Sequence, residues 1–83
     1  MYYIQARYLD ENNVEHFGKL QQHKNDFLHF DSNDSVSTLL EFNSKLQAQR
    51  TINKILKTGY QYLDLSHWPG ANKKNIQLAI IEY

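Results

Sequence analysis

The chain has 83 residues, with nine Lys and Arg against nine Asp and Glu, a formal net charge of zero, and no cysteine. These values exclude a disulfide-stapled fold and thiolate chemistry, so one packed core has to stabilise the domain. We expect a single domain over residues 1–83, because 41% of the residues are apolar and eleven of them are aromatic.

The N-terminal part of the chain has the pattern of a β-hairpin. Apolar and polar residues alternate over residues 2–9, which predicts a strand with Tyr2 and Tyr8 on one side. Residues 10–13 form a polar turn cluster, and residues 14–20 read as the return strand. The two strands and the turn therefore predict a hairpin with a loop of about four residues.

Two further strands are expected before the helix. Residues 21–26 are polar and predict a loop, whereas residues 27–30 are a short apolar stretch that predicts a strand. Residues 31–35 have turn chemistry. Residues 36–42 place their apolar side chains on one face by simple alternation, so we expect a strand there and not an earlier start of the helix.

One helix is predicted over about residues 44–58. Ser44 followed by Gln47 has the spacing of a capping box, and Gly59 supplies the stop signal. At 100° per residue the aliphatic side chains fall within roughly half of the helical wheel, which predicts a core-facing side. The residues of this predicted core face are Leu46, Ala48, Ile52, Ile55 and Leu56.

The C-terminal part returns to strand patterns. Residues 60–68 alternate and predict a strand, and the following turn over residues 68–71 has Gly70 at the position that takes a positive φ. Residues 72–75 extend the loop. Residues 75–83 predict a final strand whose Ile76, Leu78 and Ile80 suit a core face. The expected fold class is α+β, an antiparallel sheet of four to six strands with one helix on one face.

The balanced net charge hides an asymmetry along the chain. Residues 44–75 hold six basic residues against one acidic residue, whereas the rest of the chain has three basic and eight acidic residues. Such an uneven distribution of charge can orient a molecule relative to a charged partner. The candidate partner-binding residues are Arg50, Lys54, Lys57, Lys73 and Lys74. The alternative is an ordinary solvated helix face with cations near its C-terminus.

A second candidate surface comes from tyrosines of two predicted strands. Tyrosine suits half-buried strand positions for packing reasons, and it is also a residue that protein interfaces favour. The residues of this secondary candidate surface are Tyr2, Tyr8, Tyr60 and Tyr62.

No pattern for catalysis or for a cofactor occurs in the sequence. The four histidines, His16, His23, His29 and His67, have no acidic or histidine neighbour at a metal-ligand spacing. The three glycines do not form a phosphate-binding loop. We therefore expect a protein that is not an enzyme and that has no metal or cofactor. The absence of a signal-peptide pattern and of a long apolar segment leads us to expect a cytoplasmic protein that does not contact a membrane.

The order of a hairpin, a strand-to-helix junction at Leu40-Glu-Phe-Asn-Ser-Lys-Leu-Gln-Ala-Gln-Arg-Thr-Ile and a final strand resembles small accessory proteins of bacteriophages and prophages. This resemblance implies a host-interaction role, for example inhibition of a defence nuclease by an anti-CRISPR type of protein that occupies its surface.

Two hypotheses of function follow from the sequence. The first is a binding protein that occludes a protein partner with an acidic surface. The alternative is a regulator that binds nucleic acid, in which residues 49–60 act as a recognition helix and Lys73 and Lys74 contact phosphate.

Overall fold

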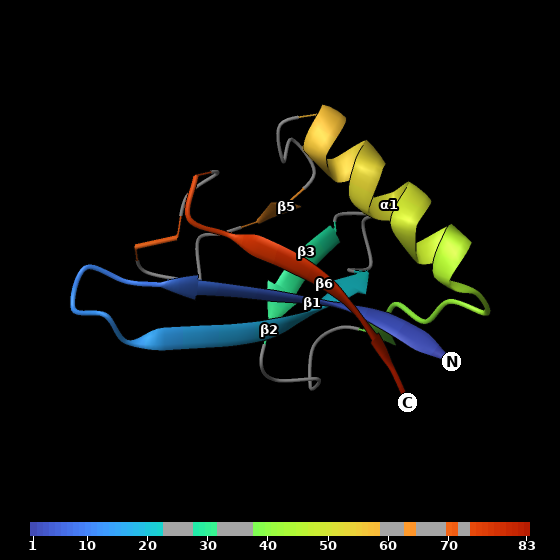
Figure 1. Ribbon diagram of the computed structural model, residues 1–83, viewed down its shortest axis with the longest axis horizontal. Helices are drawn as coiled ribbons and strands as arrows, with labels where there is room; N and C mark the ends of the chain where they lie inside the picture. Colours follow the sequence, from blue (N-terminus) through green and yellow to red (C-terminus); the bar gives the residue numbers. More distant parts are fainter. Residues whose placement is uncertain (23–27, 32–37, 59–62, 65–69, 72–73) are drawn as a thin grey trace.

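The computed structural model describes residues 1–22, 28–31, 38–58, 63–64, 70–71 and 74–83 (Figure 1). Along the chain, the elements within these residues are β1 (Tyr2–Leu9), β2 (Glu15–Gln22), β3 (Leu28–Asp31), β4 (Thr38–Leu39), α1 (Lys45–Lys57), β5 (Leu63–Asp64) and β6 (Gln77–Glu82). The helix lies across one side of the sheet, and the two chain termini lie close together (Figure 1).

The centre of the fold is an antiparallel sheet of three long strands in which β1 lies between β2 and β6. The β1–β2 pair places Ala6 opposite Gly18, and the β1–β6 pair places Ile4 opposite Ile80. The full strand order is β5-β3-β2-β1-β6, with β4 paired to the end of β2. The predicted α+β class is confirmed. The predicted four to six antiparallel strands are not confirmed, because β4 and β5 have two residues each and β5 runs parallel to β3.

The predicted hairpin is confirmed, and its turn is closed by one carboxylate. Asp10 Oδ1 accepts hydrogen bonds from the backbone N–H groups of Asn12 and Val14, at 2.8 and 3.0 Å. Asn13 takes the left-handed conformation with φ 60°, which asparagine tolerates better than most residues. Strand β2 continues two residues further than predicted, because Gln21 and Gln22 pair with both β3 and β4.

The core lies between α1 and the side of the sheet that carries the even-numbered residues of β1. Its buried apolar residues are Ile4, Ala6, Tyr8, Leu20, Phe42, Ala48, Ile52, Ile55 and Ile76. Leu78 and Ile80 of β6 pack against this cluster from the sheet edge, as the alternation of the last strand predicts. The helix is therefore held by three of its own side chains, Ala48, Ile52 and Ile55.

The helix begins and ends close to the predicted residues, but its core face is narrower than predicted. Ser44 is the N-cap and accepts a hydrogen bond from the backbone N–H of Gln47, and Thr58 is the C-cap. Leu46 and Leu56 are 60% and 53% exposed, so placing them in the core was wrong. Leu46 lies about 155° from the middle of the buried stripe at 100° per residue. The helix packs mainly on β1 and β6 among the described elements, so one strip of its surface is covered.

The predicted strand over residues 36–42 is not continuous in its described part, residues 38–42, and residues 36–37 lie outside the described residues. Thr38 and Leu39 pair with β2, whereas Phe42 forms an isolated bridge to Tyr2. Gly70 has φ +83°, as the predicted turn requires. Of the predicted strand 60–68, residues 63–64 form β5; residues 60–62 and 65–68 lie outside the described residues, as do the 23–26 part of the first loop and the 32–35 turn.

Candidate functional site

The surface of α1 that points away from the core carries three cations in a row. Arg50, Lys54 and Lys57 are all exposed, and among the described residues none of them forms an ion pair. At 100° per residue they lie within a narrow sector opposite the buried stripe, and Leu46 lies in the same sector. We call the surface formed by Leu46, Arg50, Lys54 and Lys57 the outer helix face.

Like charges at positions i and i+4 repel one another, so Arg50 and Lys54 cost the isolated helix a few tenths of a kcal/mol. Lys54 and Lys57 in the last turn interact favourably with the negative end of the helix dipole. The first turn contains no acidic residue. The outer helix face therefore combines three cations with one exposed leucine and contains no acidic residue.

The structure places the other predicted basic residues elsewhere. Lys74 is exposed and lies in the turn that precedes β6, not on α1. Lys73 lies outside the described residues. The described part of the chain thus brings Arg50, Lys54 and Lys57 together and leaves Lys74 apart from them.

The predicted tyrosine surface is not an accessible surface in β1. Tyr8 is 2% exposed and belongs to the core, and Tyr2 is half-buried against it, because both share the helix-covered side of the strand. Tyr60 and Tyr62 lie outside the described residues. The prediction missed that the side of β1 with Tyr2 and Tyr8 is the side on which the helix packs.

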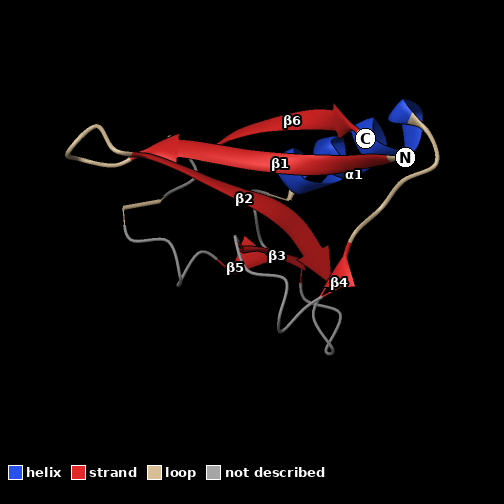
Figure 2. Ribbon diagram, turned by 90° about the horizontal axis from the view of Figure 1, so that it is seen from below, coloured by secondary structure: helices blue, strands red, loops and turns tan. Residues whose placement is uncertain are grey.

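The opposite side of the sheet, turned toward the viewer in Figure 2, carries a mixed surface. We call it the open sheet face; its side chains include Tyr3, Arg7, Phe17, Lys19 and Gln77. Lys19 Nζ lies 5.3 Å from the centre of the Tyr3 ring, and the Tyr3 and Tyr83 rings are 5.4 Å apart. Phe17 is 49% exposed. This face is polar and aromatic, and its cations are already in contact with neighbouring side chains.

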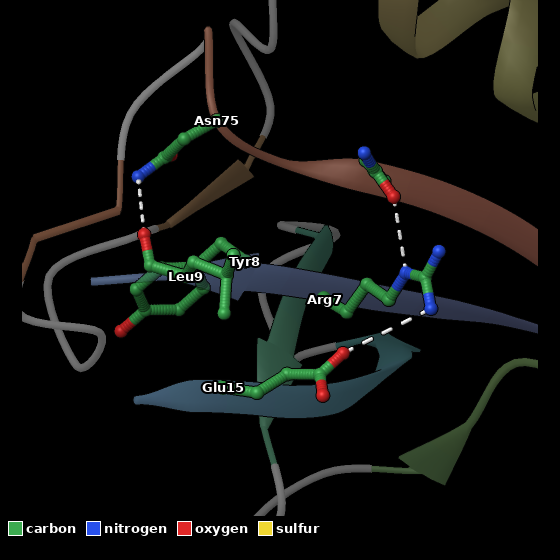
Figure 3. Close-up of a pocket in the computed structure, with 6 residues that line it drawn as sticks. Arg7, Tyr8, Leu9, Glu15 and Asn75 are labelled. Atoms are coloured by element: carbon green, nitrogen blue, oxygen red, sulfur yellow. Dashed lines mark hydrogen bonds and ion pairs between the residues drawn. The ribbon is translucent and has the colours of Figure 1, made fainter. Parts of the chain in front are cut away.

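A shallow depression of about 400 Å³ lies at the hairpin end of the sheet (Figure 3). Across it, Arg7 Nε donates to Gln77 Oε1 at 3.0 Å, and Arg7 Nη1 lies 3.8 Å from Glu15 Oε1. Asn75 Nδ2 donates to the carbonyl oxygen of Leu9 at 3.3 Å. These contacts tie β2, β1 and β6 together, which explains the arrangement as part of the fold. The described lining contains no nucleophile beside a base.

A short side-chain contact between two titratable groups joins His16 to Asp10 across the hairpin. His16 Nε2 lies 2.9 Å from Asp10 Oδ2, and the imidazole stacks on the Tyr8 ring at 4.7 Å. The hydrogen bonds from His16 and from the Val14 N–H hold the pKa of Asp10 below its usual range. Burial, followed by the nearby Asp10 charge, raises the pKa of Tyr8. The signal that sequence reasoning missed is that the hairpin register brings position 16 beside Tyr8.

At the other end of the sheet, the last residue is tied to the strand-to-helix junction. A hydrogen bond to the Glu41 carboxylate, together with burial, raises the pKa of Tyr83 to about 12. Over the described residues, no three His, Asp or Glu side chains gather as metal ligands do. The only helix found there is too short and too polar to cross a membrane.

No family model matches the chain, and comparisons with the curated proteins and with the solved structures found no match. The fold and its surfaces define a small α+β domain whose most distinctive accessible feature is the outer helix face.

Proposed function

We propose that the protein is a non-enzymatic binding protein that docks the outer helix face onto an acidic surface of a protein partner. The observation that supports this is the row formed by Arg50, Lys54 and Lys57, three exposed cations without a carboxylate partner in the described structure. Such a row contributes little to folding, whereas it attracts an acidic partner and accelerates association.

Leu46 supports a protein partner in preference to a nucleic acid. Its side chain is 60% exposed and lies one turn before Arg50 on the same sector of the helix. Burying an exposed leucine stabilises a complex when the partner offers an apolar pocket, and helix-in-groove recognition uses anchors of this kind. Phosphate backbones offer no such pocket, so a surface built only for phosphate has no use for this leucine.

The proposed action is occlusion of a functional surface on the partner. The resemblance to bacteriophage and prophage accessory proteins supports a host defence protein, such as a CRISPR nuclease, as the target in the host cytoplasm. A domain of this size covers a standard interface of about 800 Å² per partner with one helix and its neighbours.

The test is affinity capture from a bacterial lysate with the wild-type protein and a triple variant, R50E/K54E/K57E. The control is K45E, which changes a charge on the same helix outside the outer face. We expect the wild type to capture an acidic protein and this capture to persist after nuclease treatment. The triple variant should lose the capture, and K45E should retain it. Melting curves have to show that all variants fold. Equal capture by the wild type and the triple variant would overturn the proposal.

The runner-up function is nucleic-acid binding by the same three cations. The observation that favours it is that the row is purely basic and lies on one helix. The logarithm of the affinity for duplex DNA then falls linearly with the logarithm of the salt concentration, with a slope of about −0.9 for each phosphate neutralised. Capture that disappears after nuclease treatment, together with such a slope, would replace the first proposal by this one.

A further inference from the structure

Among the described residues, no strand covers the outer edge of β6. In the strand order β6 is the last strand, and within the described part of the chain it pairs with β1 alone. Figure 2 shows it as the outermost strand, with no described element beyond it. Its sequence, Gln-Leu-Ala-Ile-Ile-Glu, contains no Lys, no Pro and no bulge, the devices with which proteins block strand edges.

The hydrogen bonds at the chain ends fix which backbone groups point outward. Met1 N donates to Tyr83 O at 3.3 Å and Tyr83 N donates to Met1 O at 3.0 Å, so these two residues form a hydrogen-bonded pair. Such pairs recur at every second residue of an antiparallel ladder. Gln77, Ala79 and Ile81 therefore bond to β1. The N–H and C=O groups of Leu78, Ile80 and Glu82 point away from β1, toward the free edge.

We infer that β6 pairs antiparallel with β6 of a second copy of this chain, which joins two sheets into one. A two-fold axis midway between the two strands brings Ile80 opposite Ile80 of the second copy. The same axis brings Leu78 opposite Glu82 of the second copy. This register uses every outward-pointing backbone group of β6. A register shifted by two residues moves Glu82 opposite Ile76, which lies before the strand.

The side chains of β6 suit a second copy of the same strand. On the open sheet face, Ala79 lies opposite Ile81 of the second copy, and apolar cross-strand pairs of this kind stabilise a sheet. The one charged residue of the strand, Glu82, sits at its end. The two Glu82 side chains are then four residues apart along the pair, about 13 Å at 3.3 Å per residue. The strand thus keeps its like charges apart when it pairs with itself.

The helix offers a second surface for the same arrangement. Thr51 and Thr58 on one flank of α1 are half-buried, whereas Gln49 and Leu56 on the other flank are exposed. Because α1 lies over β1 and β6, its covered flank faces the rest of the sheet and its exposed flank faces the β6 edge. A two-fold axis perpendicular to the sheet puts both helices on the same side. Leu56, 53% exposed in the single chain, then faces the second copy.

The test compares the wild-type protein with A79E and Q5E by sedimentation between about 10 μM and about 1 mM, the range of weak association. Ala79 is exposed, and in a dimer of A79E the two introduced carboxylates would flank the two-fold axis. Gln5 pairs with Ala79 on the same face but lies one strand further from the edge. We expect the wild type and Q5E to shift from monomer to dimer with rising concentration and A79E to stay monomeric, with unchanged melting.

Amide hydrogen exchange gives an independent readout at single-residue level. In the dimer, protection of the Leu78, Ile80 and Glu82 amides rises with protein concentration, whereas Ala79 and Ile81 are protected at every concentration. A wild-type monomer at about 1 mM, a dimer that A79E leaves intact, or species larger than a dimer would each overturn the inference. So would concentration-dependent protection that does not alternate along β6.

Discussion

The orientation of α1 is tested most directly by truncating one buried and one exposed aliphatic side chain of the same helix. Ile52 is 6% exposed and packs in the core, whereas Leu46 is 60% exposed on the outer helix face. Both variants, I52A and L46A, have alanine at the changed position of the helix. Because isoleucine and leucine differ in helix propensity by only about a few tenths of a kcal/mol, the comparison between I52A and L46A mainly reports burial.

The expected cost of I52A follows from the carbons that leave the core. Truncation removes three carbons, each worth about 0.8 kcal/mol when buried, which gives about 2.4 kcal/mol. Incomplete closure of the cavity adds to this, so we expect a loss of about 3 kcal/mol in the free energy of unfolding. In a domain of this size, 1 kcal/mol lowers Tm by about 4–8 °C, so Tm should fall by about 12–24 °C.

The free energy of unfolding of L46A should lie within about 0.5 kcal/mol of the wild-type value, since truncating a mostly exposed side chain removes little buried surface. The assay is urea unfolding followed by circular dichroism, with thermal melts alongside. The slope of the free energy with urea should stay unchanged, so that the shift in midpoint reports stability alone. Similar losses in the two variants, or a larger loss for L46A, would refute the helix orientation and with it the outer helix face.

Three further predictions concern the two turns and the N-terminal end of the helix. The depressed pKa of Asp10 means that its carboxylate stabilises the fold at pH values above the ordinary 3.8, and this stabilisation is lost as pH falls through the lower folded-state pKa. D10N should therefore melt below the wild type near neutral pH, with a gap that closes in acid; a gap independent of pH would contradict the assignment. S44A should cost about 1 kcal/mol by urea unfolding, because it removes the hydroxyl that accepts from the Gln47 N–H, whereas S44T should lose less. G70A should cost about 1 kcal/mol or more because alanine is strained at φ +83°, and G70N should be milder, since asparagine tolerates that conformation; equal melts for all three proteins would refute the turn conformation.

Features that depend on short-range chemistry were predictable from the sequence. The cap at Ser44 and the positive φ at Gly70 each depend on a few neighbouring residues, and both are present in the structure. The alternation of residues 2–9 likewise predicted β1 at its observed bounds. Each of these features reflects steric and hydrogen-bonding preferences of a few neighbouring residues.

Features that depend on long-range pairing were not predictable. The alternating pattern predicted that Phe42 belongs to a strand. In the structure, Phe42 pairs with β1 at a single residue, where its N–H donates to Tyr2 O at 2.8 Å. Leu46 looked like a core residue because it lies at the border of the aliphatic half of the helical wheel. How much of that half is buried depends on the strands beneath the helix, which the wheel does not show. The same long-range pairing made the tyrosine side of β1 the buried side.

The candidate surfaces divide in the same way. The cations of the outer helix face were visible in the sequence, because helical periodicity alone gathers Arg50, Lys54 and Lys57. The β6 edge was not visible, since whether a strand is central or at an edge is a property of the strand order. An apolar strand such as β6 fits either place.

The two proposed surfaces do not compete for the same residues. The outer helix face lies opposite the buried stripe of α1, whereas β6 pairing uses the sheet edge and the helix flank that carries Gln49 and Leu56. Because the two-fold axis is perpendicular to the joined sheet, a dimer presents both outer helix faces on one side. A partner with two acidic patches then binds the second face at a high effective concentration, and its apparent affinity rises without a new contact. A79E should therefore weaken such binding while leaving the cations intact, and R50E/K54E/K57E should abolish binding while leaving the dimer intact.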